Sequence, residues 1–203
     1  MPRCCSPNCV RSSMRRRPVD RLHRRPGPCE WEKNVMKNAS SHHPVSTAAP
    51  SFLSLLDVHA RLNEIFLLHQ EALLMQDIHL ARERLLQFER ELLAHMMFEE
   101  ERLFPIYERA GRIPGGPLEL FAGEHRKMRL FLDRFKQRLD GWIPPPPDLK
   151  RQIIALFDEQ AMFKHLVEHH DLREQNILYP TLDRVTDERE RQQLLHLKGR
   201  SRS

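Results

Sequence analysis

The sequence predicts an all-α protein, an up-down-up-down four-helix bundle that follows a disordered N-terminal tail. Beyond residue 50, apolar side chains recur every three to four residues in four long segments. Stretches rich in glycine and proline separate the second segment from the third and the third from the fourth, as in bundles with short loops. No alternating strand pattern occurs, and valine and threonine are sparse.

The first fifty residues differ in composition from the rest. They hold ten Lys and Arg side chains against three acidic ones, although the whole chain carries a net charge of only +5. All four cysteines lie there, and no apolar stretch suits a secretory signal or a membrane span. We therefore expect residues 1–50 to form a disordered basic leader, with Met14 or Met36 as alternative starts. The remaining chain is slightly acidic and free of cysteine, so we expect a cytoplasmic domain that binds neither nucleic acid nor membrane.

The helices are expected at residues 51–76, at 77–110, at 118–140 and from 148 onward. Ser51, Asp77 and Asp148 can cap the first, second and fourth helices, and Gly141 ends the third. Together these helices form one predicted domain over residues 51–185. Residues 186–203 are expected to be a polar helix end or tail.

Each predicted helix carries a histidine on its apolar stripe, and two stripes also carry a glutamate. A lone carboxylate in a bundle core is unfavourable, so buried charges are paired or bind cations. No Lys or Arg lies on the first, second or fourth stripe. A bound cation is the simplest remaining partner. The predicted metal ligands are His59, His95, Glu99, His125, His170 and Glu174.

The two glutamates belong to an internal repeat. Residues 95–105 read HMMFEEERLFP and residues 170–180 read HDLREQNILYP. In both copies a glutamate follows a histidine by four residues, and then come leucine, an aromatic residue and proline. Residues four apart share one face of an α-helix, so each copy points an imidazole and a carboxylate the same way. Two such pairs facing each other would form a site for two metal ions.

Register supports this arrangement in the first hairpin. His59 lies eighteen residues before Asp77, and His95 lies eighteen residues after it. Because antiparallel helices rise equally per residue, these two imidazoles should be level. His69 lies closer to the turn and is expected to be a core or supporting histidine.

The second hairpin is less regular. His125 lies sixteen residues before Gly141, whereas His170 lies twenty-two residues after Asp148. A fourth helix that begins late would absorb this difference. His165 would be closer to level, but it lies off the stripe and lacks a glutamate four residues on. The internal repeat therefore favours His170.

These motifs resemble the hemerythrin-like (HHE cation-binding) family over about residues 51–185. The resemblance implies a non-haem site for two iron ions, in which Glu99 and Glu174 are bridging carboxylates. Imidazole and carboxylate ligands also suit manganese or zinc. Oxygen-carrying hemerythrins have His-x-x-x-His on the third helix, and this chain has Arg129 at the second position.

This departure disfavours reversible oxygen carriage and leaves the ligand set open. His69, His165 or His169 could supply a further ligand. A missing ligand would leave an open coordination position, which favours reactivity.

Other polar and aromatic residues near the motifs are expected to have structural roles. Glu100 and Glu101 are expected to be solvated surface charges. Glu124, next to His125, could support a ligand, which the sequence leaves open. The aromatic residues Tyr107 and Tyr179 are expected to pack in the core. The prolines Pro105 and Pro180 are expected to kink or end their helices.

The resemblance implies that the di-iron site binds O2, NO or peroxide. The function would be oxygen or nitric-oxide sensing, or protection under oxidative or nitrosative stress. One alternative is an oxidoreductase or an iron-donating repair protein that uses the same site. The other is a metal-free helical interaction module. The sequence predicts no catalytic residue, and it leaves open whether the chain is an enzyme and whether it forms a homodimer.

Overall fold

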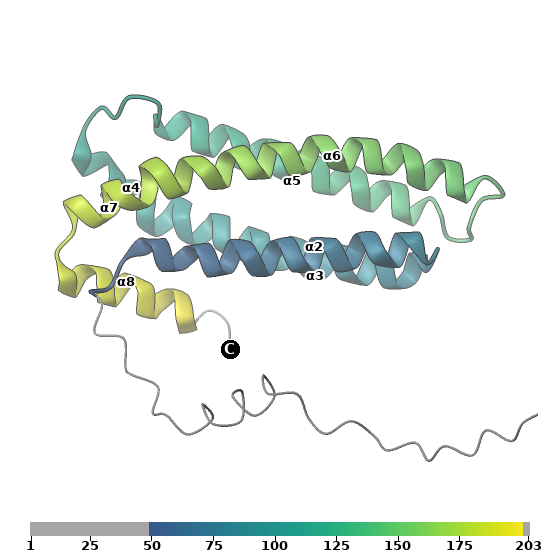
Figure 1. Ribbon diagram of the computed structural model, residues 1–203, viewed down its shortest axis with the longest axis horizontal. Helices are drawn as coiled ribbons and strands as arrows, with labels where there is room; N and C mark the ends of the chain where they lie inside the picture. Colours follow the sequence, from purple (N-terminus) through teal and green to yellow (C-terminus); the bar gives the residue numbers. More distant parts are fainter. Residues whose placement is uncertain (1–48, 201–203) are drawn as a thin grey trace, which may run out of the picture. The chain divides into compact units, whose positions relative to one another are not determined.

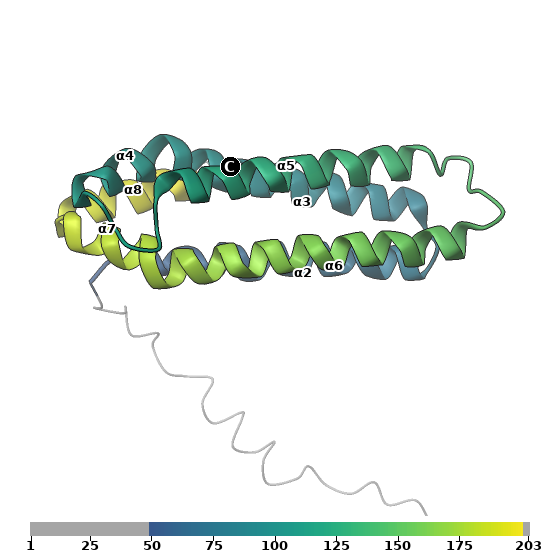
Figure 2. The same ribbon diagram turned by 90° about the horizontal axis from the view of Figure 1, so that it is seen from above.

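The computed structural model describes residues 49–200 and confirms the all-α bundle. Helices α2 and α3 form one antiparallel pair, and α5 and α6 form another (Figure 1). In addition α3 packs on α5, and α2 packs on α6, so the four helices enclose a common core (Figure 2). Their bounds are Leu56–Leu74 (α2), Ile78–Phe98 (α3), Leu118–Asp140 (α5) and Leu149–Arg173 (α6).

Shorter elements surround one end of this bundle. A 3₁₀ turn precedes α2, and a π-helical turn follows each of α3 and α6. These shorter elements are η1 (Phe52–Leu55), η2 (Glu99–Leu103), α4 (Phe104–Tyr107), η3 (Glu108–Ala110), η4 (Glu174–Leu178), α7 (Tyr179–Val185) and α8 (Glu188–Arg200).

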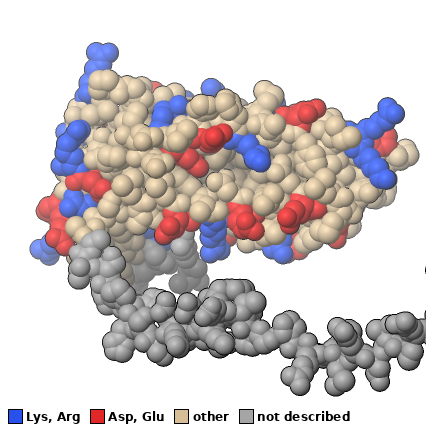
Figure 3. Space-filling view, in the orientation of Figure 1, with Lys and Arg blue, Asp and Glu red and all other residues tan. Residues whose placement is uncertain are grey.

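The expected leader lies outside the described residues, except for its last two positions. The segment expected as a polar end or tail contains helix α8. The boundaries between domains stay a prediction. Within residues 49–200, no helix combines the length and apolar character that crossing a membrane requires. The face seen in Figure 3 carries basic and acidic side chains among broad uncharged areas, so neither sign of charge dominates it.

Two of the expected N-caps form. The Ser51 side chain accepts a hydrogen bond from the backbone N–H two residues on, and Asp77 accepts one from the N–H three residues on. Asp148 occupies the cap position of α6, but its carboxylate accepts a hydrogen bond from the Gln152 side chain instead. The prediction of a capping bond there is wrong, because the side-chain amide of Gln152 binds this carboxylate instead.

The connector between α5 and α6 accounts for the unequal distances of His125 and His170 from the turn of the second hairpin. Helix α6 begins directly after Asp148, so the idea of a late start is wrong. Figure 2 shows that α6 begins farther along the bundle than α5 ends. The connector residues carry the chain across this offset, and the buried Trp142 anchors them by donating its indole N–H to Gln152. The additional residues of α6 therefore project beyond the end of α5.

Two apolar clusters fill the core. The larger one lies towards the turns after α2 and α5, and includes Leu62, Met96, Met128 and Phe163. The smaller one lies at the other end and includes Leu55, Leu103, Phe121 and Leu178. On every helix the predicted ligands fall between members of the two clusters. The six polar side chains thus form a layer enclosed by apolar packing at both ends.

His69 lies outside this layer, in the larger core cluster. Its Nδ1 lies 2.7 Å from the backbone carbonyl oxygen of Ala81, and its Nε2 lies 2.8 Å from the side-chain nitrogen of Gln160. Since the carbonyl only accepts and the amide nitrogen only donates, the ring is neutral with its proton on Nδ1. Burial lowers the pKa of His69 to about 4, below its ordinary value of 6.5.

This shift makes stability depend on pH. Between those two pKa values the unfolded chain binds a proton at His69 that the folded chain excludes, so stability falls as the pH falls. From about pH 7 to about pH 5, His69 should remove about 2 kcal/mol from the free energy of unfolding. Urea unfolding of His69→Gln should show a pH dependence weaker by that amount. The exposed His165→Gln variant should follow the wild type. Identical pH profiles for wild type and His69→Gln would contradict the assignment.

Candidate metal centre

Two π-helical turns position the carboxylates of the layer. Glu99 and Glu174 are each the first residue of a π-helical turn, and the backbone N–H five residues on bonds to each carbonyl. Pro105 and Pro180 lie two residues beyond the ends of these turns. A proline lacks an N–H and its ring crowds the carbonyl four residues back, so regular α-helix cannot continue through it. The widened turn accommodates the proline, and the helix resumes as α4 or α7. The expectation of a simple kink or end is therefore corrected.

The four imidazoles converge as two pairs. Nε2 of His59 lies 2.8 Å from Nε2 of His95, and Nε2 of His125 lies 3.1 Å from Nε2 of His170. All four rings are at most 6 % exposed. The first pair joins α2 to α3, and the second joins α5 to α6. We call these two places the α2–α3 position and the α5–α6 position.

Each carboxylate spans both positions. Glu99 places Oε1 3.5 Å from Nε2 of His95 and Oε2 3.5 Å from Nε2 of His125. Glu174 places Oε2 3.1 Å from Nε2 of His59 and Oε1 2.8 Å from Nε2 of His170. Both side chains are fully buried. The structure thus brings all six predicted side chains together, and their binding of metal stays a prediction.

The outward-facing nitrogens of the second pair rest on carboxylates. Nδ1 of His125 lies 2.8 Å from Glu100, and Nδ1 of His170 lies 2.9 Å from Glu124. Arg129 holds Glu100, and Arg173 holds Glu124. An ionised carboxylate only accepts, so each ring donates from Nδ1 and presents a lone pair on Nε2.

These contacts change two sequence expectations. Glu100 is not a solvated surface charge, because its side chain is one-third exposed and binds a ligand histidine. Glu124 contacts one of the predicted ligands, the His170 of the neighbouring helix. Arg129, which replaces a histidine of the oxygen carriers, holds the carboxylate behind His125. Glu101 is exposed, as expected.

The aromatic residue of each repeat also reaches the layer. Phe104 stacks on His125 with ring centroids 5.8 Å apart. Tyr179, at the equivalent place in the second repeat, donates its O–H to Glu99 Oε1 at 2.8 Å and lies 3.1 Å from Glu174 Oε2. Its oxygen also lies 3.3 Å from Nε2 of His59. Tyr179 is buried in the core, as expected, and its hydroxyl also reaches the layer, because an i+5 residue lies over the glutamate in a π turn and not in an α-helix.

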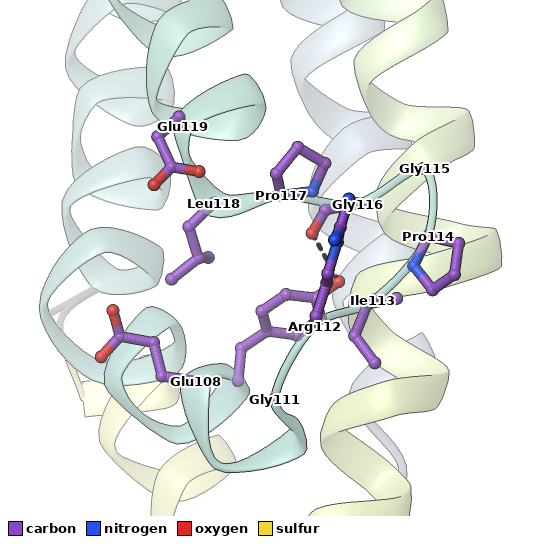
Figure 4. A pocket seen from close by; sticks show the side chains of 11 residues that line it. Glu108, Gly111, Arg112, Ile113, Pro114, Gly115, Gly116, Pro117, Leu118 and Glu119 are labelled. Atoms are coloured by element: carbon purple, nitrogen blue, oxygen red, sulfur yellow. Dashed lines mark hydrogen bonds between the residues drawn. The ribbon is translucent and has the colours of Figure 1, made fainter.

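Tyr107 is also buried in the core, as expected, but its hydroxyl binds outside the layer. Its hydroxyl donates to the carbonyl of Gly116 at 2.8 Å, across a pocket of about 560 Å³ formed by the loop before α5 (Figure 4). A Cβ at Gly116 would lie 2.6 Å from both Tyr107 and Ile177, so only glycine fits there. No histidine lines this pocket.

The three histidines that the sequence leaves open do not join the layer. Both ring nitrogens of His69 bond elsewhere. His165 and His169 lie exposed on α6 with ring centroids 4.2 Å apart. Among the described residues, the ligand-type side chains that cluster closely are the six predicted ones.

The carboxylates and imidazoles of the layer shift one another's pKa values. Burial raises the pKa of Glu99 well above its ordinary range, and the charge of Glu174 adds to this effect. Burial lowers the pKa of His170, but Glu174 and Glu99 outweigh it and raise that pKa to about 9. Burial alone would raise the pKa of Glu174, yet His170 holds it well below the usual range. A cation entering the layer would therefore replace protons on Glu99 and His170.

The donor set fits transition-metal ions. Two nitrogens bound to one ion at about 2.1 Å lie roughly 3 Å apart, as both histidine pairs do. Within the described part of the chain, Glu99 Oε2 accepts no hydrogen bond although it is buried. Unpaired buried oxygens are unfavourable, and a cation would satisfy them. Imidazole with carboxylate suits iron, manganese or zinc.

A helical bundle with this buried layer of imidazoles and carboxylates is a metal-binding bundle. The chain belongs to the hemerythrin family, because residues 54–195 match the hemerythrin HHE cation-binding domain. The match confirms the resemblance that the sequence motifs indicate.

The chain is also similar to the iron-sulfur cluster repair protein YtfE of Salmonella paratyphi B, Salmonella newport and Salmonella heidelberg. Each relative is 34% identical over 92 residues, which are 44% of this chain and 41% of the relative. The chain thus spans about two fifths of the length of these curated relatives. No solved structure matches the chain significantly.

The Tyr179 hydroxyl should tighten metal binding by fixing both carboxylates. Tyr179→Phe should fold, because the first repeat has phenylalanine at this place, and should bind metal about tenfold more weakly. Competition against a chromophoric chelator measures this affinity. Tyr107→Phe is the matched control and should leave the affinity unchanged. Equal affinities for Tyr179→Phe and wild type would refute the role of the hydroxyl.

Proposed function

We propose that the protein holds a non-haem di-iron centre that binds a small ligand such as O2, NO or peroxide. The observation that carries this proposal is the span of the carboxylates. Each of Glu99 and Glu174 turns one oxygen towards each histidine pair. One ion at the α2–α3 position and one at the α5–α6 position would then share both carboxylates.

A second observation favours cations over protons at the α5–α6 position. Both imidazoles there donate from Nδ1, so when both are neutral their Nε2 lone pairs face each other at 3.1 Å. Without a cation, a proton has to separate them. Iron would supply redox and Lewis-acid chemistry in the layer.

The residues of the chain would orient and shield this centre. Glu100 and Glu124 fix the tautomer and orientation of their histidines. Phe104 and Phe121 lie against the same two rings and help to exclude water from them. The Tyr179 hydroxyl, which burial keeps protonated by raising its pKa well above the ordinary value, offers a hydrogen-bond donor inside the layer.

The physiological role we propose is protection under oxidative or nitrosative stress, or sensing of the same small molecules. Its support is the donor set together with the similarity to relatives that are named for iron-sulfur cluster repair. Arg129 in place of a third-helix histidine favours reactivity over oxygen carriage.

Metal analysis tests the centre directly. Protein purified without chelators should contain about two irons per chain, and new near-ultraviolet and visible absorption should appear when the iron(II) form meets air. Glu174→Ala and Glu99→Ala should each lose iron, since each removes a carboxylate shared by both positions.

Glu101→Ala is the matched control, because this neighbouring carboxylate is exposed and should leave the iron content unchanged. Bound metal must also raise the melting temperature, by mass action. The proposal would be overturned if the purified protein were fully helical but contained no metal, and if chelator left its melting temperature unchanged. That result would favour an interaction module.

A second candidate, an iron-donating repair protein, is favoured by the YtfE similarity. Iron(II)-loaded protein, incubated anaerobically with sulfide and an apo iron–sulfur protein, should then restore the cluster absorption of that protein. Metal-depleted Glu99→Ala should not. Turnover of peroxide or NO without any cluster restoration would instead favour an oxidoreductase.

A further inference from the structure

We propose that the two metal positions are unequal: the α5–α6 position retains its ion, and the α2–α3 position exchanges it. This inference rests on the proposed di-iron centre and deepens it. Its basis is that the Nδ1 atoms of the two histidine pairs differ in their hydrogen-bond partners.

The α5–α6 position is supported on both rings. Glu100 and Glu124 each bind an Nδ1 at hydrogen-bond distance, and Arg129 and Arg173 hold these carboxylates in turn. Such outer partners raise the basicity of the imidazole and fix its orientation, and losing one typically costs 10- to 100-fold in metal affinity.

The α2–α3 position lacks this support. Within residues 49–198, Nδ1 of His95 is buried with no hydrogen-bond partner, and the same is true of Nδ1 of His59. The carboxylate of Asp171 lies near His59, but its Oδ1 is 3.7 Å from Nδ1, beyond hydrogen-bond distance. The described side chains place no arginine against Asp171 by a direct ion pair. Both rings are thus less firmly oriented than those of the other pair.

The two positions also differ in how well neighbouring side chains shield them from solvent. Phe104 stacks on His125 and Phe121 packs edge-on against His170, so aromatic rings cover the α5–α6 position. Asp171, beside His59, also lines a surface groove of about 480 Å³ between α2 and α6. The α2–α3 position is therefore the one adjacent to a hollow through which water, chelator or an acceptor protein's ligands can approach.

The shared carboxylates allow one ion to leave without opening the bundle. Glu99 and Glu174 each keep one oxygen at the α5–α6 position whether or not the other position is filled. After loss of one ion, the remaining ion would keep two imidazoles and two carboxylate oxygens. An iron-donating protein would need such an arrangement, because it could release one ion and keep its fold.

Chelator kinetics test this inference. Full-length protein loaded anaerobically with two equivalents of iron(II) is mixed with excess colorimetric iron(II) chelator, and release is followed by absorbance. We expect two phases of one equivalent each, with rates that differ at least tenfold.

Variants assign the phases to positions. Glu124→Gln and, independently, Glu100→Gln should accelerate the slow phase about tenfold and leave the fast phase unchanged. Asp171→Asn should leave the slow phase unchanged. His59→Ala should bind one equivalent, which leaves slowly. Circular dichroism of each variant checks that the helices are intact.

The outcomes separate the two proposals. Release of both equivalents at one rate, or acceleration of only the fast phase by Glu124→Gln and Glu100→Gln, would overturn the inference and leave the di-iron centre standing. A protein that takes up no iron under these conditions would overturn the proposed function and the inference with it.

Discussion

The burial of two carboxylates in an otherwise apolar core is the constraint on which the rest of the structure depends. Glu99 and Glu174 are fully buried, and a carboxylate in that environment has to be protonated, paired or bound to a cation. The four imidazoles around them supply nitrogen donors, and they carry positive charge only where a proton is bound, as the raised pKa of His170 favours. The nearby arginines, Arg129 and Arg173, bind Glu100 and Glu124, which contact the histidines from outside the layer. The centre of the layer is therefore left for a cation.

Much of this arrangement could be predicted from the sequence because helical periodicity relates spacing directly to position. The apolar stripes gave the four helices, and the equal count from Asp77 placed His59 level with His95. The repeat favoured His170 over His165, because it marks the glutamate four residues on. Only the structure shows that both His165 and His169 are exposed. A family match over residues 54–195 agrees with these local patterns.

What could not be predicted depends on departures from regular helix or on contacts between helices. Tyr179 and Phe104 reach the layer because of π turns, and the 100° step of an α-helix places them elsewhere. The proline that ends each repeat was the available signal for those turns. Glu100 and Glu124 touch histidines of other elements, so no spacing within one helix identifies them. Their placement follows only when the bundle has formed.

The repeat itself explains how a nearly symmetric layer becomes unequal. At its aromatic place one copy has Phe104, which covers His125 with carbon, and the other has Tyr179, which brings a hydroxyl beside His59. The residue after the ligand histidine adds to the difference, since Asp171 is present in the second copy and Met96 in the first. The two copies of the repeat therefore share the histidine and the glutamate, while most of their other residues differ. Divergence at these supporting places can change the affinity of one position without altering the ligands that both positions share.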